Sequence, residues 1–257
     1  MQLIPPPLIK VLHGAKKADR ARYQTMECFQ LRPIGRIKTP YKDKFGVPRQ
    51  AGLVPSVRGK LVLDPAFRKE EAFRGIEECS HVWILFLFDR VREKDVRLSV
   101  RPPRLGGNQK LGVFASRSPY RPNRIGMSAC RLHGVETDEQ GEMALLLSGV
   151  DLIHGTPVLD VKPYLPYADM IEEAWSKIAP EAPERWPVRI AEEVREVFEA
   201  LPDEKQQVVL ETLSLDARPA FHEKETRTYF FRIYELDVGW EIVEGRCVVC
   251  SIRTVDE

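Results

Sequence analysis

The sequence contains no apolar run long enough to cross a membrane as a helix. Its longest such run, residues 82–88, is far shorter than the roughly 20 residues that a membrane helix requires. A secretory signal is excluded as well, because the prolines at 5–7 interrupt the apolar part of the N-terminus. We therefore expect a soluble protein.

Cysteine is scarce, with 5 among 257 residues, and the number is odd. The cysteines are scattered and follow no signal peptide. Such usage is typical of free thiols in a reducing compartment and does not indicate a disulfide framework. The expected location is the cytoplasm.

The usual metal and nucleotide motifs are also missing. The single CxxC, Cys247 to Cys250, lies in an alternating apolar run, where residues three apart point to opposite faces of a strand. The 5 histidines form no HExxH or similar pair, so we expect no bound metal. Neither a P-loop nor a GxGxxG motif after a strand is present, which excludes the two familiar nucleotide sites.

Acidic residues are absent from one long window. The whole chain carries 39 basic and 38 acidic residues, yet residues 97–124 contain seven Lys or Arg and no Asp or Glu. Prolines stiffen the two loops of this window, and the planar fork of arginine matches phosphate or carboxylate oxygens. The window predicts an anion-binding surface. A solvated basic face that pairs with acidic helices elsewhere remains the alternative.

Strand-like segments dominate residues 27–168. They are short runs rich in apolar residues, and Gly, Pro and Asn turns separate them. One helix is expected from Asp64 to Gly75, with Asp64 as N-cap and Pro65 at the first helical position. Several short strands with one helix predict a mainly β fold, a partly closed antiparallel β-barrel.

Three further segments complete the predicted organisation. Residues 1–26 are expected to be a mobile leader, with Met26 as a possible natural start. Residues 169–187, rich in proline near their end, are expected to be a linker. Residues 188–257 predict a small α+β domain, in which two helical segments at 188–201 and 203–215 precede three strands.

Another group of polar residues lies on a predicted strand near residue 160. Asp160 and Lys162 are two apart, so their side chains share one face of the strand. They form either a structural ion pair or part of a working site, because Tyr164 follows at the strand's exit, where rigid scaffolds often present functional groups.

Five segments in order closely resemble the TrmO family, also called the TsaA-like or YaeB-like family, of tRNA (adenine-N6)-methyltransferases. They are PYKDKFGVPRQAGLV, SHVWILFLF, RPPRLGGN, GVFASRSPYRPNRIGMS and DLIHGTPVLDVKPYLPYA. The resemblance covers residues 27–168, and the motif at 216–221 is similar to the C-terminal module of bacterial members. It implies a β-barrel enzyme, usually a homodimer, that uses S-adenosylmethionine. The implied reaction methylates N6 of threonylcarbamoyladenosine at position 37 of tRNA.

The resemblance also implies which residues contact the cofactor. They are Gln50, Ala51, Gly52, Phe88, Asp89, Arg117, Met127, Val158, Leu159, Asp160 and Val161. Two positions depart from the family pattern. Asp89 stands where relatives carry His, and Arg124 stands where Pro is usual.

The chemistry of the implied reaction suggests roles for the remaining residues. The N6 nitrogen is a poor nucleophile that must lose a proton, so a base would assist its methylation. Asp160 is the candidate base, oriented by Lys162 or by Tyr164. The arginines expected to hold RNA phosphates or the threonyl carboxylate are Arg101, Arg104, Arg121 and Arg124, with Arg218 in the tail. An RNA-binding barrel without catalysis and methylation of a small-molecule acceptor remain alternative functions.

Overall fold

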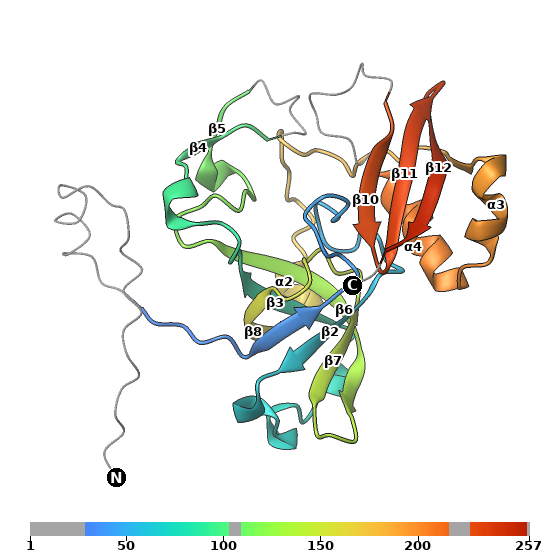
Figure 1. Cartoon of the computed structure of the whole chain (residues 1–257). Helices are drawn as coiled ribbons and strands as arrows, with labels where there is room; N and C mark the ends of the chain where they lie inside the picture. The colour runs from blue at the N-terminus through green and yellow to red at the C-terminus, as the bar shows by residue number, and fades with distance from the viewer. Residues whose placement is uncertain (1–28, 103–108, 216–226, 256–257) are drawn as a thin grey trace, which may run out of the picture.

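A closed six-stranded antiparallel barrel forms the centre of the computed structural model, which describes residues 29–102, 109–215 and 227–255 (Figure 1). Around the barrel the order is β1-β2-β7-β6-β3-β8. The strands are β1 (Gly35–Lys38), β2 (Arg58–Leu63), β3 (His81–Leu87), β6 (Ile125–Thr137), β7 (Met143–Ser148) and β8 (Pro157–Pro163). The predicted β-barrel is confirmed, and it is fully closed because β1 pairs with both β2 and β8.

Alternating side chains fill the barrel. In β3, Val82, Ile84 and Phe86 are buried while their neighbours are partly exposed. The same period of two places Cys130 and Leu132 of β6 in the core. Burial of these apolar side chains stabilises the fold, at about 25 cal/mol per Å² of apolar surface removed from water.

Three long loops leave the same end of the barrel. Neighbouring strands are antiparallel, so β1, β3 and β7 end where β2, β6 and β8 begin. The loops are residues 39–57, 88–124 and 149–156, and they carry most of the predicted site residues. Within the second loop, β4 (Ser99–Val100) and β5 (Leu111–Gly112) form a short ribbon. We call this side of the barrel the loop end.

The prediction of a single helix from Asp64 to Gly75 is wrong. The structure has three 3-10 turns instead, η1 (Pro65–Phe67), η2 (Glu70–Ala72) and η3 (Ile76–Glu78). Asp64 does cap the first, because its side chain accepts the Ala66 N–H. None of the three turns contains a fully buried residue. Phe73 and Ile76 alone in this segment pack against the core, and so few apolar contacts do not stabilise a short helix in water.

The C-terminal part is the predicted α+β unit. It comprises β9 (Val188–Ile190), α3 (Glu192–Glu199), α4 (Asp203–Ser214), β10 (Tyr229–Ile233), β11 (Leu236–Val243) and β12 (Arg246–Thr254). Its sheet has the order β10-β11-β12-β9, with β9 parallel to β12. Residues 188–190 were expected to begin the first helix, but they pair with β12 and α3 starts at Glu192.

The barrel and the C-terminal unit share one continuous hydrophobic core. Between them run α2 (Pro166–Asp169) and a stretch at 170–187 that, as described here, holds no helix or strand. No helix among the described residues combines the length and the apolar character needed to cross a membrane. The expected leader, together with Arg104 and Arg218, lies outside the described residues.

Candidate functional site

A hydrogen bond between two glycines joins the first loop, residues 39–57, to the third loop, residues 149–156. Gly52 N–H donates to the carbonyl of Gly149 at 2.8 Å. Both residues have left-handed φ, +78° and +69°, which glycine adopts without strain. A Cβ on Gly149 would lie 3.2 Å from the Cα of Gly52, tighter than an ordinary contact, so a side chain at 149 would push the two loops apart.

Asp151, in the third loop, also holds the first loop in place. Its carboxylate accepts the Ser128 hydroxyl at 2.6 Å and the backbone N–H of Ala51. Burial raises the pKa of Asp151 to about 6, against the opposing effect of the Ser128 hydrogen bond and the Arg117 charge. Sequence reasoning assigned no role to Asp151 or Ser128. A signal was available for Ser128, because the alternation of β6 places this hydroxyl on the core side with Cys130.

Two predicted cofactor residues from different loops contact each other. The Arg117 guanidinium donates a hydrogen bond to the Gln50 side-chain oxygen. Gln50 precedes the docked residues Ala51 and Gly52, and a Cβ on Gly52 would meet nothing within 4 Å. The loop end therefore presents a guanidinium and an amide beside open space.

Asp160 and Lys162 share one face of β8, as predicted. Their side chains form an ion pair at 3.3 Å, with 50% of Asp160 and 63% of Lys162 exposed. The other carboxylate oxygen of Asp160 accepts the N–H of Val161 at 2.9 Å. Leu85 of β3 lies opposite both Asp160 and Met127, so these residues form one row on the outer face of the barrel. Met127 is 54% exposed.

The neighbours of Asp160 on β8 serve the fold. Val158 is fully buried, and its carbonyl accepts the N–H of Ile34 at 2.8 Å. Val161 lies opposite the buried Ile84 and packs against the core. Leu159 is partly exposed at the β-bulge between Leu85 and Phe86.

The end of β3 places Phe88 and Asp89 differently. The Phe88 ring meets the Phe86 ring edge-on at 5.0 Å, and its N–H donates to the Arg124 carbonyl at 2.8 Å. Asp89 is exposed. Phe88 is therefore held in the barrel mouth, while the acidic side chain of Asp89 faces solvent.

Two of the predicted RNA-binding arginines donate to backbone carbonyls of their own loop. Arg124, with φ of 54°, donates to Val91 O at 2.6 Å, and Arg121 donates to Ser116 O at 3.1 Å. Each guanidinium has five N–H donors, so donors remain for a ligand. Arg101 is exposed at the edge of the described part of the loop.

Tyr164 lies at the other end of the barrel. Its N–H donates to His81 O at 3.0 Å, and its ring packs on Trp83 at 5.6 Å. Along β8, Tyr164 is six residues from Val158, or roughly 20 Å at about 3.3 Å per residue. Within one chain the structure does not bring Tyr164 to Gln50 and Arg117.

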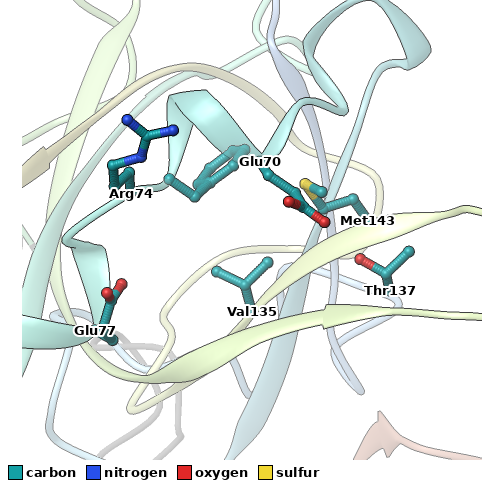
Figure 2. Close-up of a pocket in the computed structure, with 7 residues that line it drawn as sticks. Glu70, Arg74, Glu77, Val135, Thr137 and Met143 are labelled. Carbon is teal, nitrogen blue, oxygen red and sulfur yellow. The ribbon is translucent and has the colours of Figure 1, made fainter.

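A cavity of about 340 Å³ opens at that far end too, between the 3-10 turns and the β6–β7 hairpin. Figure 2 shows Glu70 and Arg74 on one side of the cavity and Val135 and Thr137 on the other. No predicted site residue lines this cavity. The loop end, with its converging polar groups, is the candidate site.

Comparison with known proteins finds two family models along the chain. The tRNA-methyltransferase O N-terminal domain matches residues 36–170, and the TrmO C-terminal domain matches residues 183–255.

Individual relatives agree with these matches. A protein of Escherichia coli K12 named tRNA (adenine(37)-N6)-methyltransferase is 42% identical over 89% of this chain and 99% of its own. A Pseudomonas aeruginosa relative, 45% identical over 81% of this chain and 90% of its own, carries the provisional name S-adenosylmethionine-dependent methyltransferase RcsF. The crystal structure of TrmO from P. aeruginosa matches with a TM-score of 0.71 and 36% identity, covering 89% of this chain and 98% of that one.

Proposed function

Since this chain belongs to the TrmO family of tRNA methyltransferases, we propose that it methylates N6 of threonylcarbamoyladenosine at position 37 of tRNA with S-adenosylmethionine. The observation that carries this proposal is the convergence at the loop end. Gln50 and Arg117 contact each other there, beside the loop that Asp151 and Gly149 hold.

The groups at the loop end fit the chemistry of this cofactor. S-adenosylmethionine combines a carboxylate, a sulfonium and an adenosine, and it supplies an activated methyl group. Arg117 offers a planar cation for a carboxylate, and Gln50 offers an amide. Phe88 and the exposed Met127 offer apolar surface, while Gly52 leaves space beside the backbone.

Asp160 is the proposed base. Methylation forms a bond between N6 and the methyl carbon and breaks the bond between that carbon and sulfur, and N6 loses its proton. Asp160 would accept this proton. One of its oxygens is oriented by the Val161 N–H and the other by Lys162, so the carboxylate is held in one orientation. Tyr164, which directly follows the end of β8, remains the alternative orienting group.

The basic window is the proposed RNA surface. Arg101 is exposed, and Arg121 and Arg124 retain donors beyond the carbonyls that they hold. Arginine contacts to RNA phosphates would position the anticodon loop without reading its sequence. Arg104 and Arg218 complete the proposed set from segments outside the described residues.

We also propose a homodimer that works in the cytoplasm. Large apolar side chains after β8 are exposed, including Tyr167 at 88%, Ile171 at 64% and Trp175 at 79%. Several exposed large apolar side chains within one short segment favour a protein interface there. The described cysteines, Cys79, Cys130, Cys247 and Cys250, are free, which favours a reducing compartment.

Mass spectrometry of nucleosides tests the reaction. Threonylcarbamoylated tRNA incubated with the protein and S-adenosylmethionine should gain one methyl group on the modified adenosine. Cofactor binding without methyl gain would favour a small-molecule acceptor. No stabilisation against heat by the cofactor would favour an RNA-binding barrel without catalysis, because a bound ligand must stabilise the folded state.

A further inference from the structure

The C-terminal unit holds the loop that carries Gln50, Ala51 and Gly52. Glu211 on α4 accepts two hydrogen bonds from Ser56, from its hydroxyl at 2.8 Å and from its backbone N–H at 3.0 Å. Gln207, one turn earlier on α4, donates to Glu211 at 3.1 Å and helps to orient the carboxylate. A charged acceptor for two donors of one residue defines both the position and the direction of the loop.

Arg185 adds a second attachment next to the first. Its guanidinium donates to Leu53 O at 2.7 Å and to the Ser214 hydroxyl at 3.0 Å. Ser214 in turn donates to Glu211 O at 2.7 Å. The end of α4 and Arg185 therefore form one hydrogen-bonded group that reaches Leu53 and Ser56, directly after the predicted cofactor contacts.

Further contacts of the C-terminal unit fall on the start of the same loop. Tyr234 N–H donates to Pro40 O at 3.0 Å. A Cβ on Gly46 would lie 2.7 Å from the Phe231 ring, so this ring covers the loop backbone closely. Figure 1 shows the loop after β1 (blue) running between the barrel and β10.

The loop is thus supported from two sides. Gly149 and Asp151 hold Ala51 and Gly52 from the barrel. Glu211 of the C-terminal unit holds Ser56, and Arg185, in the stretch just before that unit, holds Leu53. Loops with few packed contacts open at low free-energy cost. A loop fixed on both sides is preorganised, so less binding free energy is lost in ordering it.

We infer that Glu211 is a positioning residue for the methyl donor, acting through Ser56 to hold residues 50–52 in their binding conformation. This inference rests on the proposed function, because it takes Gln50–Gly52 as cofactor contacts. It gives the C-terminal unit a role in cofactor binding that is separate from any contact with tRNA.

The test combines two measurements on the full-length protein. Hydrogen exchange without cofactor reports the opening of residues 50–56, and calorimetric titration with S-adenosylmethionine reports binding. Glu211→Ala should speed exchange in this segment and weaken binding about tenfold, since hydrogen bonds to charged groups are worth about 1.5–3 kcal/mol. Ser56→Ala should do the same more mildly, and the double variant should be no worse than Glu211→Ala.

Glu192→Ala is the matched control, because Glu192 pairs with Arg195 inside α3 at 2.8 Å and not with the barrel. It should leave both readouts unchanged. Glu211→Gln, which retains an acceptor, should recover part of the binding. If Glu211→Ala fails to fold, Ser56→Ala, which leaves α4 intact, decides the outcome.

Three results would overturn the inference. The first is wild-type affinity in Glu211→Ala and Ser56→Ala. The second is unchanged exchange at residues 50–56 in these variants. A wild-type protein that binds no S-adenosylmethionine would overturn the proposed function and this inference together, and is recognised because it appears before any substitution is made.

Discussion

The Asp151 carboxylate accepts the Ser128 hydroxyl at 2.6 Å, which places an acid from the third loop against the core side of β6. The same carboxylate holds the Ala51 N–H. A partly buried acid therefore links the barrel wall to the loop proposed to bind the cofactor. Because burial disfavours its charged form, this link also makes the stability of the fold depend on pH.

Asp151→Asn should flatten the pH dependence of stability. The folded-state pKa is raised to about 6, above the usual value of about 3.9. Between these values the unfolded chain has lost the proton and the folded chain retains it, so the free energy of unfolding decreases as pH rises through this window. Asparagine cannot ionise, so the decrease should shrink. Urea unfolding at pH 4.5 and pH 7 measures the difference.

Asp43→Asn, at an exposed position of the first loop, is the control and should retain the wild-type pH dependence. If the free energy of unfolding of Asp151→Asn decreased with rising pH as much as that of the wild type, Asp151 would not be the origin of the decrease.

Asp160→Asn should lower turnover much more than cofactor affinity. Loss of a general base typically costs about 10²–10⁴-fold in rate, and the carboxylate lies on the outer face beside Lys162. Single-turnover rates at saturating cofactor measure the first effect and calorimetric titration the second. Lys162→Met should reduce the rate less, because it removes the ion-pair partner of Asp160 and leaves the proposed base in place. Unchanged turnover would exclude Asp160 as the base.

Arg101→Gln should weaken tRNA binding and reduce its dependence on salt. One lost phosphate contact lowers the slope of log K against log salt by about 0.7–0.9. Filter binding at several salt concentrations gives this slope. Arg195→Gln, in a helix of the C-terminal unit where Arg195 pairs with Glu192, should leave it unchanged. An unaltered slope for Arg101→Gln would show that this arginine contacts no phosphate.

Gly46→Ala should destabilise the protein more than Gly75→Ala does. Both glycines have left-handed φ, +87° and +86°, so both substitutions introduce similar backbone strain. Only at Gly46 would the new Cβ meet a ring, that of Phe231, whereas nothing lies within 4 Å at Gly75. We expect an additional cost of about 1–3 kcal/mol from overpacking, measured by urea unfolding. In a Phe231→Ala background, Gly46→Ala should destabilise the protein no more than Gly75→Ala does. Equal destabilisation by the two glycine substitutions in the wild-type background would contradict the close packing of Phe231 on Gly46.

Barrel strands such as β2 and β3 could be predicted from sequence because they alternate buried and less buried residues over their own length. The 3-10 turns after Asp64 could not, since a cap and a proline specify where a helix starts but not whether it has a surface to pack on. Residues 188–190 show the same limit, because their strand partner, β12, lies about sixty residues later in the chain.

The candidate site was predictable to a similar extent. The spacing of Asp160 and Lys162 was sufficient to place them on one face, and the family resemblance indicated Gln50 and Arg117. The contact between Glu211 and Ser56 joins residues 155 positions apart, and no local sequence pattern predicts it. Exposed arginines could be counted from the sequence, but the carbonyls that Arg121 and Arg124 hold depend on loop conformation.

The pairing of β1 with β8 has a consequence for biosynthesis. A chain leaves the ribosome from its N-terminus, so the barrel cannot close until Val158 of β8, the partner of Gly35, has been synthesised. The loop after β1, residues 39–57, gains its last contacts later, since Glu211 and Phe231 are translated after β8. A nascent chain can therefore complete its barrel while residues 46–56 have only half of their support. A product cut short by premature termination after β8 would lack the contacts that hold this loop in the finished protein.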